Sequence, residues 1–123
     1  MRKIETWALE RVMRDDRVLR DMAAGERIFS RGDPGSFMAI VLRGAVRIER
    51  GGKTVADIEA GSVFGEMALI DGQPRSGDAT AMTHGRLACI DEPHFKNLVR
   101  EEPEFALSLM KILVERLRAN LES

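Results

Sequence analysis

The sequence predicts a small, mainly β domain with flanking helices, whose strands fold as a jelly roll or small barrel. All eleven glycines lie within residues 17–91, where short apolar runs alternate with turn residues. The segments on either side lack glycine and carry apolar residues at helical spacing. At 123 residues the chain can bury one hydrophobic core but is too short for two ordinary domains, so we treat 1–123 as a single domain.

The composition argues against several classes of protein. Nineteen basic and twenty acidic residues give a net charge of −1, so the chain lacks a general basic field for nucleic acid. The single cysteine, Cys89, cannot form an intramolecular disulfide and is typical of a reducing compartment. The longest apolar run, residues 37–42, is far shorter than a membrane span, and the first residues do not resemble a signal peptide. We therefore expect a cytoplasmic protein, or a cytoplasmic piece of one.

Residues 1–16 are predicted to form an amphipathic N-terminal helix. Apolar residues recur there at helical spacing, and neither glycine nor proline interrupts them. Such a stripe needs a partner surface, and the β domain that follows is the nearest one. Trp7 is expected to anchor the helix to that domain, because a single tryptophan among helical apolar neighbours usually serves packing.

Residues 17–91 are predicted to form the β domain. Six short apolar runs bounded by turn residues are strand candidates: 27–29, 37–42, 45–48, 55–58, 79–82 and 87–90. Gly51-Gly52 predicts a two-residue hairpin turn, since both positions can adopt a positive φ without steric cost. Asp33-Pro34-Gly35 predicts another turn.

Residues 92–123 are predicted to form two C-terminal helices. Asp91 or Glu92 can cap the first, and Glu102-Pro103 marks the start of the second. The second helix, 103–121, has two apolar faces: Leu107, Met110, Val114, Leu117 and Leu121 at heptad spacing, and Phe105, Leu109, Ile112 and Leu113 on the other side. A domain this small can cover one face, so we expect the heptad face to form a homodimer. Burial of both faces within one domain is the alternative.

The segment 61–78 carries the residues that indicate binding chemistry. Gly65 permits a tight turn, and residues 66–70 can form one helical turn whose free N–H groups favour an anion. Arg75 follows a chain reversal and can return toward that turn, where its guanidinium would help to hold a phosphate. Glu66 would repel a phosphate, so we expect it to accept hydrogen bonds from hydroxyls such as a ribose 2′-hydroxyl. A simple ion pair between Glu66 and Arg75 is the alternative.

Two runs in this segment closely match a known motif: Phe64-Gly65-Glu66-Met67-Ala68-Leu69-Ile70 and Gly72-Gln73-Pro74-Arg75-Ser76. They resemble the phosphate-binding cassette of the cyclic nucleotide-binding domains of catabolite-activator-type regulators, protein kinase A regulatory subunits and cyclic-nucleotide-gated channels. Residues 24–29, 32–35 and 42–46 match the barrel strands and turns of that family, so the resemblance covers essentially the whole chain. It implies a cyclic nucleotide-binding jelly-roll β-barrel with an N-terminal helix and two C-terminal helices.

The resemblance also implies a role for each site residue. Arg75 would bind the cyclic phosphate, Glu66 would accept from the ribose 2′-hydroxyl, and Gly65 would permit the close approach. The backbone N–H groups that complete the phosphate site are those of Met67, Ala68 and Ser76. Further residues would contact the sugar or base: Val46 and Ile48 inside the barrel, the Ser76 hydroxyl, and Arg116 and Asn120 on the closing last helix.

After Ser76 the sequence departs from the family pattern. Family members usually continue with alanine, then a small or hydroxyl residue, then a β-branched residue, but this chain has Gly77-Asp78-Ala79. Gly77 would weaken a strand. Asp78 would oppose a bound phosphate if its side chain pointed inward, whereas strand alternation also allows it to point outward.

We therefore expect a non-catalytic sensor that binds a cyclic purine nucleotide, with cAMP favoured over cGMP, and transmits binding through its last helix to an unknown effector. Neither a cofactor nor a metal is expected, because His84 and His94 stand in unrelated contexts. One alternative is a ligand-free protein-interaction module. Others are the sensor fragment of a transcription regulator, without direct DNA binding by this chain, or the ligand domain of a channel.

Overall fold

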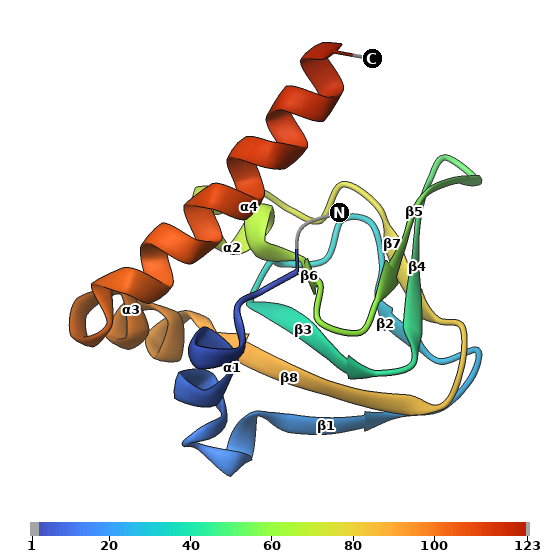
Figure 1. Cartoon of the computed structure of the whole chain (residues 1–123). Coiled ribbons are helices and arrows are strands. Elements are labelled where there is room, and N and C mark those ends of the chain that lie inside the picture. Colours follow the sequence, from blue (N-terminus) through green and yellow to red (C-terminus); the bar gives the residue numbers. More distant parts are fainter. Residues whose placement is uncertain (1–2, 123) are drawn as a thin grey trace.

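Two antiparallel sheets and a layer of helices make up the computed structural model, which describes residues 3–122 and the side chains up to residue 119 (Figure 1). The strands are β1 (Leu19–Met22), β2 (Arg27–Phe29), β3 (Phe37–Arg43), β4 (Ala45–Arg50), β5 (Lys53–Glu59), β6 (Val63–Phe64), β7 (Asp78–Ala81) and β8 (Gly85–Asp91). Their orders are β1-β8-β3-β6 and β2-β7-β4-β5, so the two sheets are not joined into a closed barrel. The predicted fold class, mainly β with flanking helices, is confirmed.

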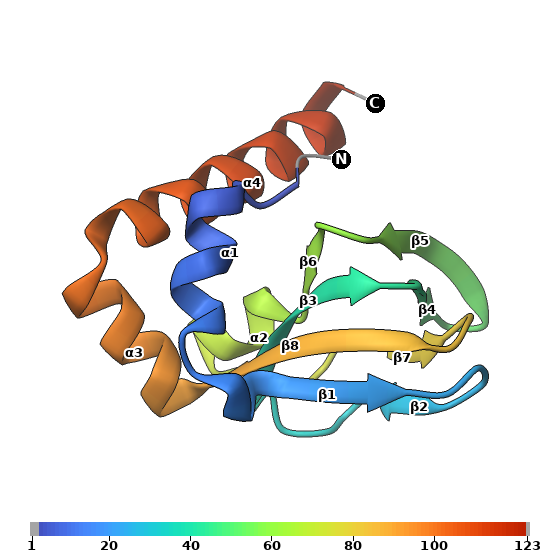
Figure 2. The ribbon, with the colours of Figure 1, turned by 60° about the horizontal axis from the view of Figure 1, so that its bottom comes forward.

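The helices gather on one side of the strands, as Figures 1 and 2 both show. They are α1 (Thr6–Met13), a 3₁₀ turn η1 (Asp16–Val18), α2 (Glu66–Asp71), α3 (Glu92–Glu101) and α4 (Pro103–Glu122). Within residues 3–122, none of them is both long and apolar enough to cross a bilayer.

β3 separates two hydrophobic cores. Met38 and Ile40 belong to the core beneath the helices, whereas Ala39 and Val41 belong to the core between the sheets. Successive strand residues point to opposite faces, so both faces of β3 are covered. This explains why its sequence is a continuous apolar run rather than an alternating one.

The N-terminal helix is shorter than the predicted interval 1–16, of which residues 1–2 lie outside the description. α1 ends at Met13, and the Asp15 carboxylate accepts a hydrogen bond from the Arg17 N–H to begin η1. This local bond starts a separate turn and ends the helix. Trp7 packs partly buried against the helical core, as predicted.

The six predicted strands and the hairpin are present, with no boundary shifted by more than two residues. Gly51 and Gly52 both have positive φ, 59° and 79°, so the predicted turn between β4 and β5 is confirmed. The sequence analysis missed β1 and β6. β1 contains two charged residues and β6 has only two residues, so neither forms an apolar run, and both depend on pairing with their neighbours.

The two C-terminal helices begin where the sequence predicts. Asp91 is the cap of α3, and its carboxylate accepts a 2.9 Å hydrogen bond from the His94 N–H. α4 has the two predicted faces. The face with Phe105, Leu109 and Ile112 is buried, whereas Leu107, Met110, Val114 and Leu117 are exposed. The side chain of Leu121 lies outside the described residues.

Candidate functional site

The predicted cassette lies where β6 ends, at the junction of the helices and the two sheets. Gly65 begins α2 with a φ of 77°, in the left-handed region that favours glycine, and Gly72 ends it with a φ of 73°. A Cβ atom at Gly65 would lie 2.8 Å from Nη1 of Arg75. The glycine is therefore required both for the turn and for the close approach of the arginine.

The backbone of Arg75 is held in place by two hydrogen bonds to the loop between β2 and β3. Its N–H donates to the carbonyl of Asp33 over 2.8 Å, and its own carbonyl accepts from the N–H of Gly32 over 2.9 Å. These bonds connect the cassette to the turn between β2 and β3. The predicted Asp33-Pro34-Gly35 turn thus fixes the arginine in position.

The side chain of Arg75 is buried and is only 3% exposed. Nη1 donates to the carbonyl of Gly65 over 2.7 Å, and Nη2 donates to the carbonyl of Phe37. The guanidinium carbon lies 4.0 Å from the ring centre of Phe29 and 5.0 Å from that of Phe37. Carbonyl dipoles and aromatic faces thus surround the charge.

Among the described residues, no carboxylate lies within ion-pair distance of the Arg75 guanidinium. Burial lowers the pKa of the guanidinium, although the charges of Glu66 and Asp33 oppose the shift, and arginine remains protonated. Its Nε atom is buried and has no hydrogen-bond partner among the described residues. A buried, protonated donor without an anion is a place where an anionic ligand would compensate the cost of burial.

Glu66 does not pair with Arg75. It is 2% exposed, and its Oε1 accepts from Nη1 of Arg116 in α4. Nη2 of Arg116 also donates to the carbonyl of Val63 in β6. The alternative of a simple ion pair between Glu66 and Arg75 is therefore wrong among the described side chains.

Arg116 of α4 donates to the carboxylate of Glu66 and to the carbonyl of Val63. Its contact with a base, which the resemblance implies, stays a prediction. Sequence spacing did place Arg116 on the same face of α4 as Ile112, which is the buried face. Nothing in the sequence indicated that a residue fifty positions away is its partner.

The remaining predicted site residues occupy different environments. Met67 exposes its side chain on α2, whereas Ala68 packs against the turn at Gly35, where an added Cβ would lie 2.3 Å from that of Ala68. Val46 is completely buried in the core between the sheets, and Ile48 is only partly buried beside it. The side chain of Asn120 lies outside the described residues.

The departures after Ser76 have a structural explanation. Asp78 pairs with Arg27 at 3.2 Å and accepts from the N–H of Arg31 at 2.8 Å, so its carboxylate is engaged with the strand and loop of β2. At Gly77, an added Cβ would lie 2.4 Å from the carbonyl oxygen of Glu49. A glycine is needed there because β4 approaches too closely for a side chain.

The histidines occupy the predicted kinds of position. His84 lies in the turn between β7 and β8, and His94 lies in the first turn of α3. Over the described part of the chain, no three histidine, cysteine, aspartate or glutamate residues are grouped to hold a metal ion.

Comparison with known proteins agrees with this geometry. The family model for the cyclic nucleotide-binding domain matches residues 19–102. The "CRP-like cAMP-activated global transcriptional regulator" of Mycobacterium tuberculosis is 31% identical over 103 residues, covering 80% of this chain and 46% of that protein. The chain thus spans about half the length of this curated relative.

Two solved structures have the same fold over 96% of this chain. The catabolite activator protein of Thermus thermophilus is 32% identical, with a TM-score of 0.83 and 58% of that chain covered. A structure described as "A cyclic-GMP-dependent signalling pathway regulates bacterial phytopathogenesis" is 28% identical, with a TM-score of 0.84 and 98% of that chain covered. With its cassette, its two sheets and its helical layer, this chain belongs to the cyclic nucleotide-binding domain family.

Proposed function

We propose that this chain is a non-catalytic sensor domain that binds a cyclic purine nucleotide at the cassette. The observation that carries the proposal is Arg75, whose charge is buried, held by carbonyls and rings, and not paired with a carboxylate among the described residues. A cyclic phosphate is a monoanion. Its burial beside Arg75 would supply the missing counter-ion.

Glu66 is proposed to accept a hydrogen bond from the ribose 2′-hydroxyl. Its carboxylate lies at the start of α2, next to Gly65, whose carbonyl accepts from Arg75. An ionised carboxylate accepts several hydrogen bonds, so Glu66 can hold a hydroxyl and the guanidinium of Arg116 at the same time. Met67, Ala68 and Ser76 would complete the phosphate site through their backbone N–H groups.

Arg116 is proposed to transmit binding to α4. Its guanidinium joins α4 to both Glu66 and the start of β6. A hydrogen bond from the ligand to Glu66 would alter the carboxylate to which Arg116 donates, and we expect this to change the position or the rigidity of α4. The helix would then present this change to an effector, whose identity the proposal leaves open.

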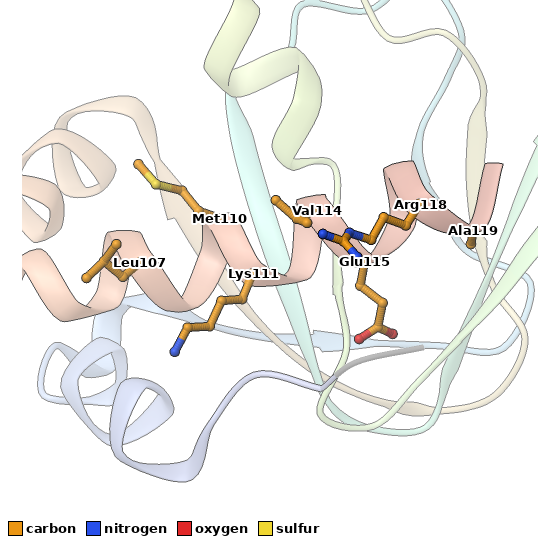
Figure 3. Close-up of a pocket in the computed structure, with 7 residues that line it drawn as sticks. All are labelled: Leu107, Met110, Lys111, Val114, Glu115, Arg118 and Ala119. Atoms are coloured by element: carbon orange, nitrogen blue, oxygen red, sulfur yellow. The ribbon is translucent and has the colours of Figure 1, made fainter. Parts of the chain in front are cut away.

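The outer face of α4 is proposed to form a homodimer. A groove of about 590 Å³ runs along this face, and all its lining residues come from α4: Leu107, Met110, Lys111, Val114, Glu115, Arg118 and Ala119 (Figure 3). Exposed apolar residues at heptad spacing are the pattern of a helix that pairs with another helix. Through this face a change in α4 would reach a second copy of the chain.

The experiment that tests ligand binding is isothermal titration of the chain and of Arg75→Ala with cAMP and cGMP. We expect the wild type to bind one or both, and the variant to bind at least about thirtyfold more weakly, because a desolvated charge pair contributes roughly 2–5 kcal/mol. Arg47→Ala is the control, since Arg47 pairs with Asp57 on the outer face of β4. Circular dichroism would establish that each variant is folded. A folded wild type that binds neither nucleotide would favour the ligand-free interaction module.

The role of Glu66 is tested with Glu66→Gln and 2′-deoxy-cAMP. The variant is expected to weaken cAMP binding about tenfold or more, since hydrogen bonds to charged groups contribute about 1.5–3 kcal/mol. Its effect on 2′-deoxy-cAMP should be under about threefold, because that ligand lacks the hydroxyl. Equal losses for the two ligands would show that Glu66 acts through Arg116 or the fold, not through the ribose.

Transmission is tested by amide hydrogen exchange with Arg116→Ala. Saturating nucleotide is expected to slow exchange at residues 61–78 in both proteins, but to slow it in α4 only in the wild type, because the variant lacks the link to Glu66. Arg100→Ala is the control, an exposed arginine on α3 outside the groove of α4. Protection of α4 that survives in Arg116→Ala would contradict the proposed route.

The homodimer is tested by sedimentation. We expect the wild type to sediment as a dimer and Leu117→Glu to sediment as a monomer, because a charge in the heptad face would be buried without a partner. Val99→Glu, an exposed apolar position on α3, should remain dimeric. A monomeric wild type at high micromolar concentration would refute this interface.

A further inference from the structure

Arg50, the last residue of β4, stands next to the cassette although it lies outside the cassette sequence. Its Nη2 donates to the hydroxyl oxygen of Ser76 over 3.3 Å. Ser76 is the residue after Arg75. The guanidinium of Arg50 therefore contacts the immediate chain neighbour of the buried arginine. The two residues are 26 positions apart in the chain, so no local sequence pattern indicates this contact.

The strand directs Arg50 toward the space between the sheets. Residues two apart on a strand share a face, and Val46 and Ile48 belong to the core between the sheets. Arg47 is on the opposite face, where it pairs with Asp57 of β5. Arg50 continues the inner row beyond Ile48, at the end where the row becomes exposed.

Gly77 leaves the side chain of Arg50 unobstructed. β4 and β7 are antiparallel, with Ile48 opposite Ala79 and Glu49 opposite Asp78. One further step in this register brings Gly77 opposite Arg50, and the 2.4 Å contact that a Cβ at Gly77 would make with β4 demonstrates how close the two backbones are. Without a side chain at position 77, Arg50 extends over the strand to Ser76.

The charge of Arg50 is not neutralised by a neighbouring acid. Among the described side chains, no carboxylate lies within ion-pair distance of it, although Arg17, Arg20, Arg27, Arg47 and Arg86 each have such a partner. Asp78, on the adjacent strand β7, is already engaged by Arg27. Arg50 therefore keeps hydrogen-bond donors available at the rim of the site.

We propose that Arg50 recognises the base of the bound nucleotide and favours guanine over adenine, which rests on the proposed binding of a cyclic nucleotide at Arg75. A guanidinium carries only donors, and guanine presents two adjacent acceptors, O6 and N7, that match its fork. Adenine presents N7 beside an amino donor, which would face another donor. The expectation that cAMP is favoured rested on resemblance alone, whereas the rim residues favour cGMP.

The test is titration of wild type, Arg50→Ala, Arg50→Lys and the control Arg47→Ala with cGMP, cAMP and cIMP. Cyclic IMP keeps O6 and N7 but lacks the 2-amino group of guanine. Arg50→Ala is expected to weaken the binding of cGMP and of cIMP about tenfold, because the variant loses a bidentate contact with the base. Its affinity for cAMP should change less than about twofold. Arg50→Lys should not restore cGMP binding fully, because lysine has no planar fork.

The outcomes separate this inference from the proposed function. If the folded wild type binds none of the three nucleotides, both fail together. A second outcome is that Arg50→Ala weakens the binding of all three nucleotides equally and Arg50→Lys restores it. Arg50 would then contact the phosphate, and the inference about the base would be wrong. Recognition of the O6 and N7 edge is also overturned if Arg50→Ala leaves the affinity for cGMP unchanged. The same holds if the variant changes the affinity for cIMP as little as it changes the affinity for cAMP.

Discussion

The rest of the site depends on one costly arrangement, the burial of the Arg75 guanidinium with no described carboxylate at ion-pair distance. Burying an unpaired charge is unfavourable, and the fold offsets this cost with the carbonyls of Gly65 and Phe37 and with two aromatic rings. Each of these groups requires its own support: a glycine at position 65, a turn that holds the backbone of Arg75, and the start of β3. The cassette is therefore positioned by three separate elements, and its charge is compensated only in part. An anion is the group that would complete it.

Glu66 could have supplied that counter-ion, but it is engaged elsewhere, and the proposed route of communication starts from this engagement. The carboxylate lies near Arg75 but bonds to Arg116, fifty residues away on α4. The same helix packs Phe105, Leu109 and Ile112 against the domain and exposes its heptad face on the other side. A change at Glu66 would thus act on a helix that is held against the domain by its buried residues. The exposed face of the same helix can contact a second copy of the chain. In the proposed function, the ion pair between Glu66 and Arg116 takes part in both binding and signalling.

The sequence was informative where the structure depends on local patterns. The hairpin at Gly51-Gly52, the cap at Asp91 and the two faces of α4 follow from neighbouring residues, and the cassette follows from an extended motif. The sequence was uninformative where the structure depends on contacts between distant segments. The pairing of Glu66 with Arg116, the contact of Arg50 with Ser76 and the strand β6 have no local pattern, because each arises only when the sheets and α4 have assembled.

The departure from the family pattern at Gly77-Asp78 shows how such contacts change the meaning of a sequence. From the sequence alone, a glycine in a strand and an acid beside a phosphate site both predict weaker binding of the phosphate. In the fold, Asp78 is neutralised by Arg27, and Gly77 gives the space in which β4 brings Arg50 to Ser76. In the proposed function, Arg75 would bind the phosphate, which every cyclic nucleotide shares, while Arg50 at the rim would contact the base. Base preference could then change without any change in the cassette motif itself.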